Sequence, residues 1–284
     1  MSEIPEGTFI SAIEDPARAN QAVQALMADA APQMPTIPAP ADDQLDLPGG
    51  VITSDGRVLR TAVVRELTGA DEEALARAQV SGSFARMMTT MLTCGTVRVG
   101  ELYPTTELLE GLLTGDRDAL FLAIRIATYG PELDTSGQCP HCGGTFEITI
   151  RLDELPIRSL RDPVADRSFT VPLRRGGTAL VRLPTGADVT RAWEDSGLTD
   201  AERNTLLLAA CVISITGTDG AETPVAGQTA EVRELGLADR RTILTELGRA
   251  EPGPQWRDGV RFTHDRCGQE VTWAASAADL FRDL

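Results

Sequence analysis

CPHCGG, residues 139–144, places two cysteines at a two-residue spacing and follows them with glycine. The pattern has two opposed interpretations. It can be the active-site loop of a thiol oxidoreductase, or it can be half of a zinc ribbon, in which tight turns present ligands to one tetrahedral ion. Glycine after the second cysteine suits such a turn, because it adopts a positive φ without a steric penalty.

The residues after this motif favour the zinc ribbon. TFEITIRL (145–152) is rich in β-branched residues and predicts a strand. In a dithiol oxidoreductase the first cysteine lies instead at a helix N-terminus, which lowers the pKa of its thiol. The first residues, MSEIPEGTF, lack the apolar stretch of a secretory signal, so we expect a reducing cytoplasmic compartment.

A second copy of the pattern lies 125 residues further along the chain. HDRCGQ (264–269) again has two potential ligands at a two-residue spacing, followed by glycine and a predicted strand. The two pairs together make a closed set of three cysteines and one histidine, as in structural zinc sites. The sequence therefore predicts a structural zinc ion bound by Cys139, Cys142, His264 and Cys267. His141 is expected to face solvent, Cys211 is expected to be a core residue, and Cys94, at a helix end, is expected to have a structural role.

Two further short matches have the same order along the chain. TGAD occurs at 68–71 and 185–188, each time after a predicted hairpin, and the dipeptide DR recurs at 116–117 and 239–240. Their offsets are 117 and 123 residues, which grow slowly toward 125 at the cysteine motif. We predict an α+β fold with two related halves, 48–150 and 151–284, each made of a β-hairpin, helices and a Cys/His knuckle.

The segments around these motifs predict individual elements. Residues 68–92 have the pattern of one helix with acidic residues in its first turn. Residues 115–130 are apolar on nearly every face and predict a buried helix. Residues 1–47, rich in proline and alanine, predict an extended arm that contains a short helix at 16–28, with a disordered tail as the alternative.

Composition excludes several classes of function. Of the 284 residues, 42 are acidic and 26 basic, and the net charge of -16 argues against a nucleic-acid partner. There is no lysine, hence no phosphate-binding loop of the Walker type and no Schiff-base nucleophile. Two histidines leave little for a catalytic triad. The longest apolar run, 206–215, is too short to cross a bilayer. We expect a protein that is not an enzyme and does not insert into membranes.

With these motifs in view, the chain resembles the baseplate hub and hub-assembly proteins of T-even-type contractile phage tails and of related bacterial contractile injection systems. The resemblance rests on the TGAD segment, the helix GDRDALFLAIRIATYGPEL, the CPHC knuckle and the closing DLFRDL. It implies a structural or assembly role, in several copies, beside other baseplate, spike or inner-tube proteins. His264, where cysteine is commoner, departs from the usual knuckle.

Two alternatives stay open at this point. One is a cytosolic thiol oxidoreductase that uses Cys139 and Cys142. The other is a zinc-ribbon accessory protein that binds nucleic acid through a local arginine cluster. The cluster would comprise Arg151, Arg158, Arg161, Arg174 and Arg175.

Overall fold

The computed structural model describes residues 42–80, 84–225, 227–255, 259–273 and 280. Within these ranges the chain forms eight α-helices and several small antiparallel sheets, which confirms the predicted α+β class. None of the helices in the described ranges is long and apolar enough to span a membrane. The helix predicted at 16–28 lies outside the described residues.

The first sheet has the order β1-β2-β3 and is formed by β1 (Asp42–Ile52), β2 (Val58–Arg65) and β3 (Thr96–Val99). A tight turn joins β1 to β2, and Gly56 in it has a φ of 82°. β1 begins five residues inside the arm predicted over 1–47, since Asp42 already pairs with Arg65. An extended arm and an edge strand have the same local sequence pattern, so only the pairing with β2 distinguishes them.

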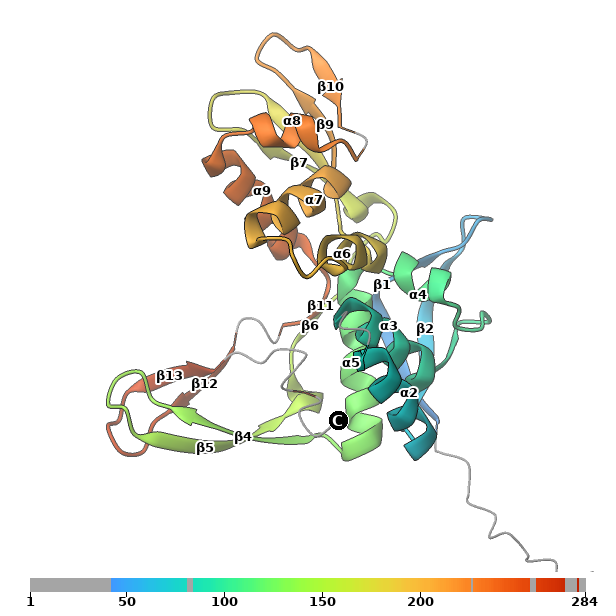
Figure 1. Ribbon diagram of the computed structural model, residues 1–284, viewed down its shortest axis with the longest axis vertical. Helices are drawn as coiled ribbons and strands as arrows, with labels where there is room; N and C mark the ends of the chain where they lie inside the picture. Colours follow the sequence, from blue (N-terminus) through green and yellow to red (C-terminus); the bar gives the residue numbers. More distant parts are fainter. Residues whose placement is uncertain (1–41, 81–83, 226, 256–258, 274–279, 281–284) are drawn as a thin grey trace, which may run out of the picture. The chain divides into compact units, whose positions relative to one another are not determined.

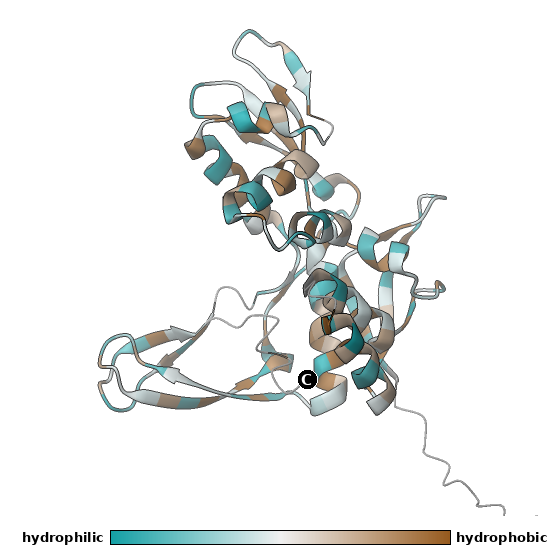
Figure 2. Ribbon diagram, in the orientation of Figure 1, coloured by the Kyte–Doolittle hydropathy of each residue, from teal (hydrophilic) through white to brown (hydrophobic). Residues whose placement is uncertain are grey.

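Four helices follow this hairpin in the first half of the chain: α2 (Gly69–Val80), α3 (Phe84–Gly95), α4 (Thr106–Gly111) and α5 (Thr114–Tyr129). The single helix predicted over 68–92 is thus two helices, and residues 81–83 between them lie outside the described ranges. α5 is the buried helix expected from its pattern. Leu120, Phe121 and Ile124 are among its core side chains. The helix itself lies beside β1 and β2 (Figures 1 and 2).

The second sheet has the order β10-β9-β8-β7. Its strands are β7 (Ser168–Pro172), β8 (Thr178–Arg182), β9 (Val212–Thr216) and β10 (Glu222–Pro224). The helices of this region are α6 (Gly186–Trp193), α7 (Asp200–Cys211), α8 (Thr229–Glu234) and α9 (Leu237–Ala250). A second hydrophobic core includes Cys211, as the sequence predicted for this residue, together with Leu208 and Ile243.

Both TGAD segments form the same hydrogen-bonded clasp. The Asp71 carboxylate accepts two hydrogen bonds from the Arg65 guanidinium, at 2.8 and 3.0 Å, and two from Thr68, both at 2.8 Å. Burial opposes ionisation here, but the bonds from Arg65 and Thr68 lower the pKa of Asp71 to about 2. The same four contacts recur in the second half among Arg182, Thr185 and Asp188.

The arginines of the two DR dipeptides also make matching contacts. Arg117 donates to the Leu109 carbonyl at 3.0 Å and to the Thr89 hydroxyl at 3.1 Å. Each of these bonds joins α5 to an earlier helix of the first half. The corresponding bonds of the second half join Arg240 to the Val232 carbonyl, at 2.9 Å, and to the Thr205 hydroxyl, at 2.8 Å.

Asp116, beside Arg117, is a buried carboxylate at the start of α5. Its Oδ1 accepts the backbone amides of Gly49 and Gly50 in β1, at 2.6 and 3.2 Å. Its Oδ2 has no hydrogen-bond partner among the described residues. Burial raises the pKa of Asp116 to about 6, against the opposing effect of the two amides.

Two hairpins and one short pairing complete the described fold. β4 (Glu132–Gln138) pairs with β5 (Thr145–Arg151), and β12 (Val260–Thr263) pairs with β13 (Glu270–Trp273). The remaining elements are β6 (Ile157–Arg158), paired with β11 (Gly253–Pro254), and the 3₁₀ turns η1 (Leu152–Glu154) and η2 (Ala165–Arg167). Each hairpin carries one of the predicted knuckles at its turn (Figure 1).

Candidate metal centre

The turn between β4 and β5 is built by CPHCGG. The Cys139 amide donates to the Gly144 carbonyl at 2.8 Å, and the Gly143 amide donates to the Cys139 carbonyl at 2.9 Å. Gly143 has a φ of 67°, which a side chain would make unfavourable. The turn therefore needs its glycine, and it presents both cysteines on one hairpin.

The turn between β12 and β13 repeats this geometry. The His264 amide donates to the Gln269 carbonyl at 2.9 Å, and the Gly268 amide donates to the His264 carbonyl at 2.8 Å. Gly268 also has a φ of 67°. The two turns thus share their hydrogen bonds and their glycine conformation.

The two turns bring the four predicted ligand side chains together, with all ligand atoms within 4.8 Å of one another. The sulfur atoms of Cys139 and Cys267 lie 3.8 Å apart. His264 Nδ1 lies 3.4 Å from the Cys142 sulfur and 3.2 Å from the Cys267 sulfur. A tetrahedral ion with sulfur ligands at about 2.3 Å separates two sulfurs by about 3.8 Å, so the cluster has the dimensions of a metal site.

His264 is oriented for this role. It is only 4% exposed, and its Nε2 lies 3.3 Å from the Thr145 carbonyl. A carbonyl can only accept, so this contact places the ring proton on Nε2 and leaves Nδ1 as the acceptor facing the sulfurs. No sequence signal identifies Thr145, because its contribution is a backbone carbonyl.

Aromatic packing joins the two hairpins beside the cluster. The rings of Phe146 and Phe262 meet edge to face with centroids 4.8 Å apart. Cys139, Phe146 and Val271 form a small buried core there. His141 is exposed, as expected, and its Nε2 lies 3.1 Å from the Glu270 carbonyl across the two hairpins.

The geometry does not match a dithiol oxidoreductase. CPHC lies in a turn between two strands rather than at a helix N-terminus. Burial opposes ionisation of Cys139, but the amides of His141 and Cys142 lower its pKa to about 7. In a zinc knuckle, backbone amides stabilise the metal-binding thiolates in the same way. The cysteines are free, and the sulfur of Cys139 lies 3.8 Å from that of Cys267 on the other hairpin.

Two of the five arginines proposed as a nucleic-acid patch have local partners. Arg151 pairs with Asp153 at 2.7 Å and with Glu132 at 4.0 Å. Arg158 donates to the Arg249 carbonyl. These contacts give the two arginines structural roles within the fold.

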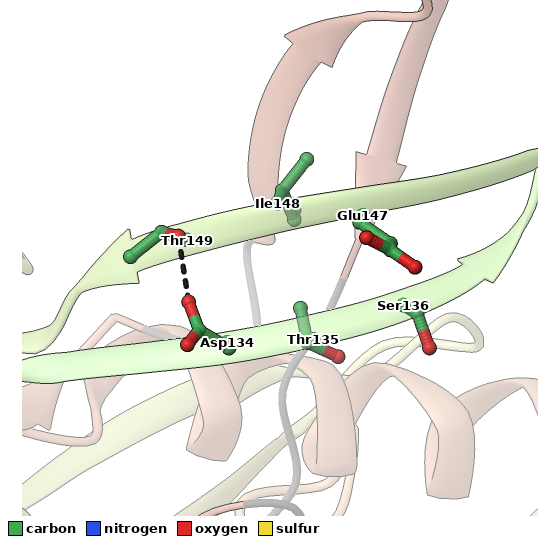
Figure 3. Close-up of a pocket in the computed structure, with 6 residues that line it drawn as sticks. All are labelled: Asp134, Thr135, Ser136, Glu147, Ile148 and Thr149. Atoms are coloured by element: carbon green, nitrogen blue, oxygen red, sulfur yellow. Dashed lines mark hydrogen bonds between the residues drawn. The ribbon is translucent and has the colours of Figure 1, made fainter.

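A hollow of about 500 Å³ lies along β4 and β5, lined by residues 134–136 and 147–149 (Figure 3). The Thr149 hydroxyl donates to Asp134 across the strands at 2.6 Å. Ser136 lies opposite Glu147 in the strand register. These four polar side chains are exposed and come from facing positions of one hairpin, which is the ordinary surface of a two-stranded sheet, whereas Thr135 is buried.

Comparison with known proteins identifies one family. The family described as T4 bacteriophage base plate protein matches residues 52–247, well over half of the chain. No curated protein and no solved structure matches the chain. The matched region includes the first knuckle, the second sheet and the strands β2 and β3 of the first sheet, and it ends before the second knuckle.

Proposed function

Because the chain belongs to the T4 bacteriophage base plate protein family, we propose that it is a structural or assembly component of the baseplate hub in a contractile, phage-tail-like injection system. The family match is the observation that carries this function. The proposed role is not enzymatic. The proposed partners are other baseplate, spike or inner-tube proteins. Several copies of this chain would bind them in the cytoplasm, where the particle assembles.

The Cys/His cluster would hold one structural zinc ion. Three thiolates and one imidazole suit zinc, and four protein ligands leave no open position for a substrate. The spacing of the ligand atoms, the orientation of His264 by Thr145 and the buried Cys139 support this assignment. Zinc would act as a cross-link between two hairpins that are more than 100 residues apart in the sequence.

The two halves of the chain would be related by internal duplication. Support comes from the repeated order of hairpin, two helices, strand, two helices and knuckle hairpin along residues 42–151 and 168–273, to which the second range adds the short strands β10 and β11. The matching clasps of Asp71 and Asp188 and the matching bonds of Arg117 and Arg240 support it further. We place the boundary of the halves near residue 150, with the arm before β1.

Elemental analysis of the purified full chain tests the metal site. One zinc per chain is expected, and Cys142→Ser should lose it. Cys94→Ser is the matched control, since Cys94 lies at the end of α3 and outside the cluster. A structural zinc contributes on the order of 10 kcal/mol of apparent binding free energy, so its removal should also unpair the two hairpins. Absence of stoichiometric zinc, or equal zinc in both variants, would contradict the site.

Truncation tests the role in assembly. A chain that begins at Pro40 keeps all of β1, and we expect it to retain its melting temperature and zinc content but to give fewer assembled particles. The physical reason is that a proline-rich arm loses little entropy when a neighbouring subunit fixes it. Wild-type particle yield from the shortened chain would refute a role for the arm, and wild-type yield without the whole protein would refute the baseplate function.

A further inference from the structure

A short backbone pairing joins the two halves of the chain. The Thr114 amide donates to the Pro184 carbonyl at 3.2 Å, and the Gly186 amide donates to the Leu112 carbonyl at 2.9 Å. Together they form an isolated antiparallel bridge between residues 112–115, where α4 meets α5, and residues 184–186, where α6 begins. Most of this junction is buried, including Leu113.

Each side of this junction has a counterpart in the other half. By the offset of the DR dipeptides, residues 112–115 correspond to residues 235–238 between α8 and α9, which we call the α9 surface. By the offset of the TGAD segments, residues 184–186 correspond to residues 67–69 at the start of α2, which we call the α2 surface.

Both counterparts are more exposed than their equivalents. Gly236 and Ala238 of the α9 surface are exposed, whereas the matching Leu113 and Gly115 are buried. Leu237, which matches the half-buried Thr114, is 84% exposed. On the α2 surface Gly69 is exposed, and a Cβ built there would have no described atom within 4 Å. At the equivalent Gly186 a Cβ would lie 2.3 Å from the Arg117 side chain.

The exposed charges around the α2 surface are acidic, and those around the α9 surface are mixed. Arg233 and Arg241 are exposed on either side of the α9 surface, with Glu234 exposed beside Arg233. Glu66 and Glu72 are exposed on either side of the α2 surface. Opposite charges at the rim of a contact favour encounter in one register.

We propose that a second copy of this chain docks head to tail, with the α2 surface of one copy against the α9 surface of the next. The contact would repeat the pairing that the halves make within one chain, with the Gly69 amide donating to Leu235 and the Leu237 amide donating to Leu67. Because the two surfaces differ, the contact is heterologous and each copy keeps one free surface of each kind until a ring closes. The inference rests on the correspondence of the halves and not on the metal.

Sedimentation velocity of the full-length protein over a concentration series tests this contact. Leu237→Arg blocks the α9 surface and Gly69→Glu blocks the α2 surface. Both positions are exposed and Gly69 has no positive φ, so both variants should fold and keep the zinc content and melting temperature of the wild type. Tyr103→Arg, at an 83% exposed position outside both surfaces, is the control.

We expect concentration-dependent oligomers from the wild type and the control, and monomers from each blocked variant. An equimolar mixture of the two variants should give a heterodimer, because each retains the surface that the other has lost. Wild-type protein that stays monomeric at its highest soluble concentration would overturn the proposal. So would blocked variants that oligomerise like the wild type, or a mixture that stays monomeric. Zinc content is measured separately, so failure of the metal site leaves this result interpretable.

Discussion

Asp116 should make the protein less stable as the pH rises toward neutrality. Its carboxylate is buried at the start of α5, and burial raises its pKa from 3.8 to about 6. A raised pKa means that the folded state binds the proton more tightly than the unfolded chain. The stabilising effect is complete below the unfolded pKa and is lost as the pH rises through the folded pKa.

The size of this effect follows from the two pKa values. A shift from 3.8 to about 6 corresponds to about 3 kcal/mol of unfolding free energy, lost in full above the folded pKa. About half of that loss has already occurred at about pH 5, so the change between about pH 5 and about pH 7.5 is about 1.5 kcal/mol.

Asp116→Asn isolates this contribution. The amide oxygen can still accept the hydrogen bonds from Gly49 and Gly50, and the position no longer ionises. Urea unfolding followed by tryptophan fluorescence at several pH values should show a smaller loss of stability with rising pH in the variant. Asp239→Asn is the control, because Asp239 is the partly exposed counterpart in α9 and accepts the Arg174 amide at 2.7 Å. Parallel pH dependences of wild type and Asp116→Asn would refute the reasoning.

Two further substitutions test the packing of the junction and the clasps. Gly115→Ala should unfold at a markedly lower temperature, because its Cβ would lie 1.6 Å from the Pro252 carbonyl oxygen, whereas Gly111→Ala, with open space around it, should be neutral or slightly stabilising. Equal melting temperatures would contradict the close approach of α5 to β11. Asp188→Asn should cost about 1–3 kcal/mol of unfolding free energy, since it removes the charged partner of a bidentate Arg182 pair. A cost near zero in urea unfolding would show that the clasp does not stabilise the fold.

The knuckles and hairpins were predictable because their signals are local. Cysteine spacing, a glycine that tolerates positive φ and the strand pattern after it all lie within about ten residues of Cys139. The constant offset of 125 residues then indicated His264 and Cys267 as the other pair. The repeated TGAD segments likewise indicated recurring structure. Their sequence does not show that Asp71 forms a clasp with Arg65.

Other features depended on contacts between distant residues. Residues 42–46 belong to the sheet because β2 pairs with them, and 68–92 contains two helices although its composition suits one. The burial of Asp116 is invisible in the sequence, where a carboxylate at the first turn of a helix predicts an exposed residue that favours the helix dipole.

The sequence by itself therefore determined which residues could be ligands, which segments could form hairpins and which motifs recur. Only the tertiary structure decided that the four ligand atoms meet within 4.8 Å, that Thr145 orients His264, and that Leu113 is covered while Gly236 at the matching position is not. Local patterns set the conformations a segment can adopt. Burial and the distance between two side chains depend on every element that packs around them, and that information is spread over the whole chain.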